Sequence, residues 1–315
     1  MKIADNIPVS PCYLKQVTMG EGETPVVEID PGLFAKLDYM MPTLSFKDRG
    51  SSVLIAQALE MGVKKVIQDS SGNAGCSVAA YSARAGIEAI IYLADSTSEQ
   101  KIKMIEAYGA TVVKIKGSRE DVASAAREEV KRSNIFYASH VHNPTFAQGM
   151  KSYIYEVFDQ FNGKLPGTIF VPLGNGTLFY GIYHGIKDLI KYGYVHKFPK
   201  ITAIQAFNCA PLYHSYIKGI QAPYEIVNQG TVANGIAIAK PANGSDILKI
   251  TEEIGAEIIA VTEQEISEAH QYLAKKGFYV ELTSAVNYAG YKKYISNNKE
   301  ATEELCLITL CGASK

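Results

Sequence analysis

The 315-residue sequence contains no tryptophan, only five cysteines and no excess of charge of either sign. The cysteines are odd in number and none are spaced Cys-x-x-Cys, which argues against a disulfide framework and a zinc ribbon and predicts reduced thiols. Lys and Arg number 31 against 32 Asp and Glu, which gives a net charge of −1. This balance argues against a nucleic-acid-binding surface and an acidic disordered tail.

The sequence also predicts no targeting or membrane segment. Residues 1–16 carry charges and no apolar stretch typical of a secretory signal. The uncharged run 167–186 has the length of a membrane helix, but Pro172, Gly174 and Gly176 near its centre predict a strand, a turn and a helix instead. The histidines do not have the spacing of metal ligands. We therefore expect a cytoplasmic protein that binds no metal, no membrane and no nucleic acid.

Helix-like stretches alternate with short β-branched runs from about residue 50 onwards, over a length typical of about two domains. This alternation predicts an α/β fold, and the continuous apolar runs predict mostly parallel sheets covered on both faces. The expected strands are 65–69, 89–93, 111–115, 135–139, 168–173, 201–206, 257–261 and 305–310. The expected helices are 51–61, 73–85, 99–108, 119–131, 145–160, 178–192, 263–276 and 284–296.

Some boundaries are marked by local chemistry. Three expected helix starts have the spacing of capping boxes, namely Thr97 with Gln100, Ser118 with Asp121, and Thr262 with Glu265. Residues 207–245 are rich in proline and glycine, and we expect loops around a site there rather than a domain boundary.

The first segment that suggests chemistry is Pro-Thr-Leu-Ser-Phe-Lys-Asp-Arg-Gly at 42–50, which leads into an expected helix. Lys47 would sit at the positive end of the helix dipole, which disfavours its charged form. A lowered pKa suits a lysine that forms a Schiff base, because only the neutral amine attacks an aldehyde. The alternative is a solvated lysine paired with Asp48.

The second segment is Ser-Ser-Gly-Asn-Ala-Gly at 70–75, between an expected strand and an expected helix. Small residues, hydroxyls and free N–H groups at a helix start suit a carboxylate. Asn73 could donate a hydrogen bond to a phenolate-like oxygen. The alternative is an ordinary capped turn.

The third segment is Gly-Asn-Gly-Thr at 174–177, again between a strand and a helix. Consecutive backbone N–H groups at a helix N-terminus bind phosphate. The segment is neither a P-loop nor a dinucleotide fingerprint, because Phe179 stands at the third glycine position. The alternative is a glycine-rich turn without a ligand. Together, the three segments are the parts needed to bind pyridoxal phosphate and an amino acid.

On these residues the chain resembles the β family (fold type II) of pyridoxal-phosphate enzymes, and within it the threonine synthases. The matching segments span most of the chain and lie at 20–25, 42–50, 71–74, 108–110, 143–144 with Gly149 and Lys151, 174–177 and 310–312. The resemblance implies two three-layer αβα domains with twisted, mostly parallel sheets. A small mobile domain would cover 51–147, and a large domain 1–50 and 148–315, with the active site between them and closure over the substrate.

The resemblance also implies roles for individual residues. Lys47 would form the Schiff base with pyridoxal 5'-phosphate and move the α-proton. Asn73 would bond the 3-hydroxyl oxygen of the cofactor and, with Ser70 and Ser71, hold the substrate carboxylate. The cofactor phosphate would be held by the backbone of Gly174, Asn175, Gly176 and Thr177.

Two positions depart from the family pattern. Cys311 stands where the family places a Ser or Thr hydroxyl against the pyridine nitrogen. The thiol is a weaker donor, and Thr309 on the same strand face could substitute for it, or Cys311 could be a buried core thiol.

The second departure concerns the substrate. Phe146 stands where threonine synthases have an arginine that binds the phosphate of O-phosphohomoserine, and Val141 replaces a small polar residue. An apolar ring cannot pair with a dianion. His140 and His142 lie nearby and could compensate, or be structural.

These features leave several functions open. The first is a lyase of the threonine synthase type, with conversion of O-phosphohomoserine to threonine as lead reaction and the protein as a possible homodimer. The second is a serine or threonine dehydratase or a β-replacement enzyme, favoured by Phe146 and by residues 281–285, which resemble a dehydratase segment that lines the cofactor ring. The third is a non-catalytic homologue that binds pyridoxal phosphate or an amino acid, suggested by Cys311 and by a chain that stops three residues after Gly312. A nicotinamide oxidoreductase is a distant fourth.

Overall fold

The computed structural model describes residues 7–298 and 304–314. The chain divides into two compact units: unit 1 comprises Met1–Gly22 and Met41–Ser152, and unit 2 comprises Glu23–Met40 and Tyr153–Lys315. These bounds differ from the expected domains, which assigned residues 1–50 to the large domain. The physical reason is packing, because the helices that begin at Pro11 and at Asp48 contact helices of unit 1.

Unit 1 contains a parallel sheet of strand order β5-β4-β3-β6. The strands are β3 (Lys65–Gln68), β4 (Glu88–Ala94), β5 (Thr111–Ile115) and β6 (Phe136–Tyr137). The helices are α1 (Pro11–Val17), α2 (Asp48–Glu60), α3 (Asn73–Ala85), α4 (Glu99–Ala107), α5 (Arg119–Ser133) and α6 (Pro144–Met150). Every strand of this sheet was expected from the sequence, although β6 is shorter than its expected range.

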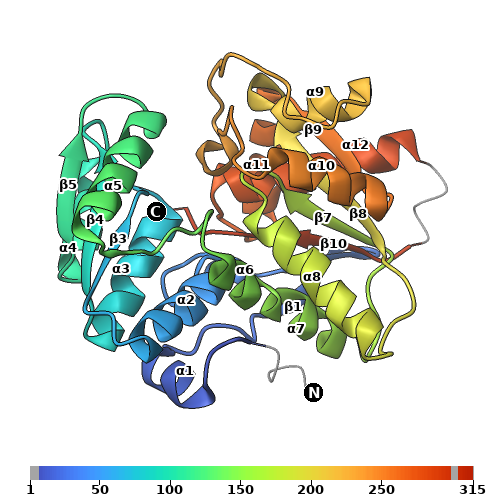
Figure 1. The fold of residues 1–315 in the computed structure, drawn as a ribbon. Helices are drawn as coiled ribbons and strands as arrows, with labels where there is room; N and C mark the ends of the chain where they lie inside the picture. The colour runs from blue at the N-terminus through green and yellow to red at the C-terminus, as the bar shows by residue number, and fades with distance from the viewer. Residues whose placement is uncertain (1–6, 299–303, 315) are drawn as a thin grey trace. The chain divides into compact units, whose positions relative to one another are not determined.

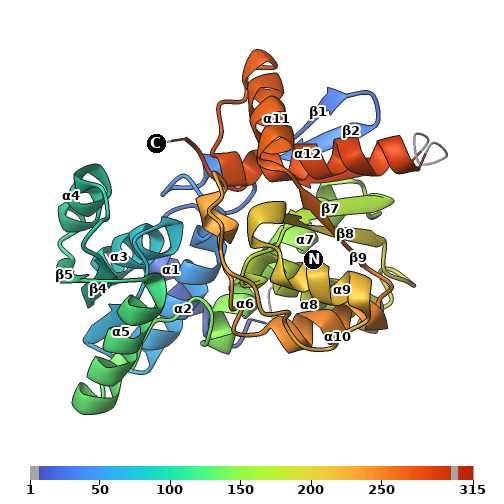
Figure 2. The ribbon, with the colours of Figure 1, turned by 90° about the horizontal axis from the view of Figure 1, so that it is seen from above.

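Helices cover both faces of this sheet. On β4, Tyr92 packs with Val122 of α5, whereas Ile91 faces Gly75 of α3. Because neighbouring side chains of a strand point to opposite faces, α5 and α3 must lie on opposite sides. Figure 2 shows the same layers, with α3 and α4 on one side of the strands and α5 on the other.

Unit 2 contains a six-stranded sheet of order β1-β2-β10-β7-β8-β9 (Figure 1). The strands are β1 (Val26–Asp30), β2 (Leu33–Lys36), β7 (Thr168–Pro172), β8 (Lys200–Ala206), β9 (Glu257–Val261) and β10 (Cys306–Thr309). The helices are α7 (Ser152–Gln160), α8 (Thr177–Lys191), α9 (Pro211–Lys218), α10 (Gly244–Glu253), α11 (Glu263–Lys275) and α12 (Leu282–Asn297). All neighbouring strands run parallel except β1 and β2, which form an antiparallel pair at one edge.

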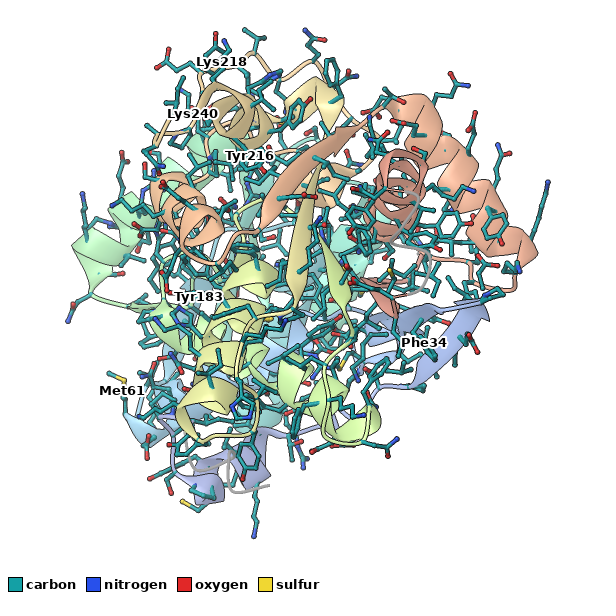
Figure 3. All side chains as sticks on the ribbon, turned by 90° about the vertical axis from the view of Figure 1, so that its right-hand side faces the viewer. Phe34, Met61, Tyr183, Tyr216, Lys218 and Lys240 are labelled. Atoms are coloured by element: carbon teal, nitrogen blue, oxygen red, sulfur yellow. The ribbon has the colours of Figure 1, made fainter. Side chains whose placement is uncertain are left out.

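The core of unit 2 lies between this sheet and α12, which packs across β7, β8 and β9. The Phe170 ring of β7 meets the Tyr291 and Tyr294 rings of α12 edge to face, with centroids 5.8 and 5.4 Å apart. The opposite side of the sheet carries α8 and α10 (Figure 2). The hydroxyl of Tyr183 on α8, a residue labelled in Figure 3, donates to Glu253 of α10 at 2.8 Å, which ties these two helices together.

A buried ion pair holds β2, the second strand of the sheet in unit 2. The Lys36 ammonium of β2 is fully buried and lies 2.7 Å from the Glu156 carboxylate of α7. It also donates to the Thr24 carbonyl oxygen and to the Gln160 amide oxygen, so all three of its protons have partners. A buried charge is tolerated when all of its hydrogen bonds are made, so the role of Lys36 is structural: it joins β2 to α7.

Several sequence predictions are corrected in detail. The expected helix 145–160 is two helices, α6 and α7, separated at Lys151. The expected loop region 207–245 contains α9 and two short 3-10 helices, and the strands β1 and β2 and the helices α1 and α10 were not expected. The capping boxes at Ser118 and Thr262 are confirmed. The box at Thr97 is wrong, because α4 begins after Ser98 and its third residue is then Lys101 instead of Gln100.

In the part of the chain that the structure describes, no helix is long and apolar enough to cross a membrane. The same part contains no cluster of three or more metal-ligating side chains. The cytoplasmic location and the homodimer stay predictions.

Candidate active site

Lys47 lies directly before α2, which begins at Asp48, three residues earlier than the expected helix 51–61. Its side chain is half-buried, and its Nζ atom lies 4.2 Å from the centroid of the Phe46 ring and 6.0 Å from that of Phe146. The two aromatic rings limit the positions that the amine can take. The Lys47 amine is therefore partly accessible and lies at the positive end of a 13-residue helix.

Asp48, the next residue, is fully buried and directs its carboxylate into the core of unit 1. It accepts hydrogen bonds from the Thr43 backbone N–H at 2.7 Å, the Thr43 hydroxyl at 2.5 Å and the Ser77 hydroxyl at 2.5 Å. Burial raises the pKa of the Asp48 carboxyl above its ordinary value, although the bonds from Ser77 and Thr43 oppose this shift. These contacts fasten the lysine turn to α3.

The turn at 70–75 joins β3 to α3, which begins at Asn73. The backbone packs so closely here that a Cβ atom on Gly75 would lie 1.8 Å from the Ser70 carbonyl oxygen. The buried Ser70 hydroxyl accepts from the Gly72 N–H at 3.3 Å, while Ser71 and Asn73 are partly exposed. The turn thus presents hydroxyl, amide and N–H groups at a helix N-terminus in unit 1, the unit that also contains Lys47.

His140 and Phe146 lie in the same unit. Phe146, on α6, is fully buried and fills the space beside Gly50, where a Cβ atom would lie 2.6 Å from its ring. The His140 ring meets Phe146 edge to face at 6.0 Å, and its Nδ1 atom is buried with no hydrogen-bond partner among the described residues. Burial, followed by the positive charge of Lys47, lowers the pKa of His140 well below its ordinary value. His140 is therefore a neutral imidazole at pH 7.

The glycine turn 174–177 lies in unit 2, between the end of β7 and the start of α8. Gly176 has a φ of +79° and packs so closely on α10 that a Cβ atom would lie 2.5 Å from Ile247 Cδ1. The Asn175 amide oxygen accepts from the Ala242 N–H at 3.4 Å, which links the turn to the loop that precedes α10. The first backbone N–H groups of the 15-residue helix α8, beginning at Thr177, point towards this turn.

Cys311 lies beyond β10 in unit 2 and is fully buried. Its Sγ atom donates to the Thr309 carbonyl oxygen at 3.6 Å, and the same oxygen accepts from the Asn287 amide at 2.6 Å. The Thr309 hydroxyl is hydrogen-bonded to the Tyr153 hydroxyl at 2.7 Å. Thr309 is thus bonded to Tyr153 in the core, and Cys311 to the Thr309 carbonyl oxygen and the Asn287 amide.

The start of α12 fixes the segment after Cys311. The Ser284 hydroxyl accepts from the Gly312 N–H at 3.0 Å and donates to the Gly312 carbonyl oxygen at 3.1 Å. The Glu281 carboxylate lies against Gly312, where a Cβ atom would lie 2.6 Å from Glu281 Cδ. The segment 281–285, which resembles one that lines a cofactor ring, therefore lies beside the residues that follow β10.

The pyridoxal-phosphate-dependent enzyme family has a sequence model that matches residues 17–312. The chain belongs to this family. Threonine synthase of Methanocaldococcus jannaschii is 34% identical over 307 residues, which cover 94% of this chain and 76% of that protein. Threonine synthase of Methanosarcina acetivorans is 32% identical over 311 residues, which cover 95% of this chain and 76% of that protein.

Solved structures show the same fold. The processed form of threonine deaminase isoform 2 from Solanum lycopersicum aligns with a TM-score of 0.82 at 22% identity, over 97% of this chain and 87% of that one. Serine racemase from Dictyostelium discoideum aligns with a TM-score of 0.79 at 22% identity, over 98% and 99% of the two chains. These likenesses, together with the parallel sheets, confirm the predicted α/β fold of the type II pyridoxal-phosphate enzymes, and membership of the family confirms the cofactor.

The residues present fit pyridoxal phosphate. Lys47 offers an amine, Asn73 an uncharged donor, and the turn 174–177 a glycine-lined helix start for a phosphate. Sequence reasoning missed the buried contacts of Asp48 with Thr43 and Ser77. The available signal was the position of Ser77 four residues after Asn73, which places both on one face of α3.

Proposed function

We propose that this pyridoxal-phosphate-dependent enzyme is a lyase that eliminates or replaces a substituent at the β- or γ-carbon of an amino acid. The lead reaction is conversion of O-phosphohomoserine to threonine. The observation that carries the proposal is the 34% identity with threonine synthase of Methanocaldococcus jannaschii over 94% of this chain. The position of Lys47 at the start of α2 supports it.

Each site residue has a role in this proposal. The Lys47 amine binds the cofactor covalently and moves the proton at the substrate α-carbon. Ser70, Ser71 and Asn73 bind the substrate carboxylate, and the Asn73 amide also donates to the 3-hydroxyl oxygen of the cofactor. When bound, pyridoxal phosphate supplies the electron sink that stabilises negative charge at the α-carbon.

The remaining cofactor contacts belong to unit 2. The backbone of Gly174, Asn175, Gly176 and Thr177 binds the phosphate, because helix N-terminal N–H groups favour an anion. Cys311 faces the pyridine nitrogen as a weak donor, since the Thr309 hydroxyl is engaged by Tyr153. Lys47 and Asn73 belong to unit 1, whereas this turn and Cys311 belong to unit 2.

A dehydratase acting on serine or threonine is the second candidate, and Phe146 favours it. This ring is fully buried and occupies the position where threonine synthases have the arginine that binds the substrate phosphate. Burying a phosphate dianion beside an apolar ring is unfavourable, whereas a hydroxyl is tolerated there. The structural likeness to threonine deaminase is consistent with this alternative without deciding it.

A pair of product assays distinguishes the two reactions. We expect purified protein loaded with pyridoxal phosphate to release inorganic phosphate from O-phosphohomoserine and to form threonine, and Lys47→Ala to do neither. Release of 2-oxo acid from serine or threonine, without phosphate release, would favour the dehydratase. If a protein that binds the cofactor converts neither class, the chain is a non-catalytic binding homologue and the proposal is wrong.

A further inference from the structure

The Asp48 carboxylate is a fully buried acid of unit 1. It is 0% exposed and accepts three hydrogen bonds, all from donors of neighbouring segments. Thr43 donates to the Asp48 carboxylate twice, through its backbone N–H and through its hydroxyl. The backbone N–H can act only as a donor. Ser77 adds a second hydroxyl to the same oxygen atom, Oδ1, that the Thr43 hydroxyl contacts. Such a set of donors matches an ionised carboxylate.

These bonds join the two cofactor-binding segments of unit 1. Asp48 immediately follows Lys47, and Thr43 begins the turn that carries it. Ser77 lies one helical turn after Asn73, so both residues lie on one face of α3. The Asp48–Ser77 bond is therefore a direct polar contact between the start of α2 and the face of α3 that carries Asn73.

A second acid continues this arrangement along the same helix face. Tyr81 follows Ser77 by one turn, and its hydroxyl donates to the Glu21 carboxylate at 3.0 Å. Glu21 also accepts from the Thr18 hydroxyl and the Met19 N–H, each at 3.0 Å. The face of α3 that begins with Asn73 is thus fastened at two successive turns to segments outside α3.

We propose that Asp48, acting with Ser77, is a positioning residue that fixes the Lys47 amine relative to the Asn73 amide. The inference rests on the proposed function, because it assumes that both groups bind one cofactor. Covalent binding at Lys47 and hydrogen bonding at Asn73 must act on the same small molecule, so an error in their separation reduces the rate of proton transfer. Asp48 itself contacts neither cofactor nor substrate.

Ser77→Ala tests this inference, and Ser82→Ala is its matched control. Both serines are fully buried on α3, but the Ser82 hydroxyl has no hydrogen-bond partner among the described residues, whereas Ser77 donates to Asp48. The visible circular dichroism of bound pyridoxal phosphate reports the orientation of the cofactor, and steady-state kinetics report proton transfer. We expect Ser77→Ala to weaken the dichroism and lower kcat by about tenfold at little change in KM, and Ser82→Ala to alter neither.

Thr43 provides a second test from the other side of Asp48. Thr43→Val keeps the shape and removes the hydroxyl bond, so it should change the dichroism in the same direction as Ser77→Ala. Thr43→Ser keeps the hydroxyl and should restore the wild-type signal. This pair separates a lost hydrogen bond from a general loss of stability.

The outcomes separate this inference from the proposed function. If wild-type protein shows no visible band with pyridoxal phosphate, the proposed site assignment fails and this inference fails with it. If wild type shows the band but Ser77→Ala keeps its dichroism and kcat, only the positioning role is overturned. Equal losses in Ser77→Ala and Ser82→Ala would also overturn it, because removal of any buried hydroxyl would then have the same effect.

Discussion

In the proposed site, the side chains of Cys311 and Thr309 decide which donor faces the pyridine nitrogen of the cofactor. The thiol of Cys311 donates weakly to the Thr309 carbonyl oxygen, and the Thr309 hydroxyl is bonded to Tyr153. The proposed contact therefore depends on the chemistry of one sulfur atom.

Substitution of Cys311 gives a graded prediction. Cys311→Ser should bind pyridoxal phosphate about fivefold more tightly than wild type and Cys311→Ala less tightly, because a hydroxyl is a stronger donor than a thiol. Fluorescence titration of the cofactor-free protein measures both. Cys306→Ala, a second buried cysteine on β10, is the control and should leave the affinity unchanged. Equal affinities for Cys311→Ser and Cys311→Ala would contradict the assignment.

Burial of the single residue His140 makes the stability of the folded protein depend on pH. Its pKa is lowered in the folded protein, mainly by burial and then by the charges of Lys47, Arg119 and His142, whereas an unfolded histidine titrates near pH 6.5. Below that pH the unfolded chain binds a proton that the folded chain does not. The stability associated with neutral His140 is therefore complete above pH 6.5 and is lost as the pH falls.

His140→Leu removes this proton uptake and keeps an apolar side chain. We expect denaturant unfolding of wild type to lose up to about 1.4 kcal/mol per pH unit more than the variant below pH 6.5. Asp48 and Asp69 have raised pKa values, which act in the opposite direction, but both proteins share them. Parallel stability curves for wild type and variant would contradict a buried neutral His140.

At the scale of elements, the turn between β3 and α3 is held by close backbone packing. A Cβ atom on Gly75 would lie 1.8 Å from the Ser70 carbonyl oxygen, whereas on Gly72 its nearest neighbour would be the Ser70 hydroxyl at 3.8 Å. The first contact requires the backbone to move, and the second is ordinary van der Waals contact. The same turn therefore offers a severe and a mild substitution.

Gly75→Ala should lower the free energy of unfolding by about 3 kcal/mol, because overpacking against a backbone oxygen cannot be relieved by a rotamer change. Gly72→Ala, in extended backbone that alanine can adopt, should cost less than about 1 kcal/mol. Urea unfolding followed by circular dichroism measures both. A loss of stability as large in Gly72→Ala as in Gly75→Ala would show that the turn is not packed as described.

Helices and strands with a clear apolar periodicity or clear caps were predictable from the sequence. Short strands, and a helix inside a region rich in proline and glycine, were not. The apolar runs that became β7 and β8 and the helices with clear caps, α5 and α11, follow from local periodicity. The strand β1 is short and only partly buried, and β2 has only four residues and ends in the charged Lys36, so their apolar patterns are weak. The helix α9 was missed inside a proline-rich and glycine-rich region, although Pro211 at its start and Gly219 at its end are ordinary helix signals.

The candidate site was predictable to the same degree. Lys47, Asn73 and the glycine turn stand in local motifs at helix starts, which the sequence displays directly. The bond from Ser77 to Asp48 spans 29 positions and depends on how α2 packs on α3, so no local pattern contains it. The lowered pKa of His140 likewise follows from burial, which a single sequence does not display.

At the scale of the whole molecule, the proposed cofactor contacts are divided between the two compact units. Lys47 and Asn73 belong to unit 1, and the glycine turn and Cys311 belong to unit 2. A ligand that binds only the folded state stabilises every unit that must be folded to hold it. Cofactor binding should therefore stabilise both units together.

Calorimetry of the full chain tests this coupling. At a free pyridoxal phosphate concentration of about 100 times Kd, binding adds about 2.7 kcal/mol to the folded state. We expect either a single unfolding transition that moves to higher temperature, or two transitions that both move. If two transitions are seen and only one moves, the cofactor is held by one unit alone.

The attachment of pyridoxal phosphate to Lys47 is the central claim, and peptide mass measurement after borohydride reduction tests it most directly. Reduction makes the link between the cofactor and its lysine permanent, so the modified residue can be identified by digestion. The account predicts that the peptide containing Lys47 carries the mass of the reduced cofactor and that Lys47→Ala protein takes up no covalent label. Label on a different lysine, or an unlabelled Lys47 in protein that binds the cofactor, would contradict it.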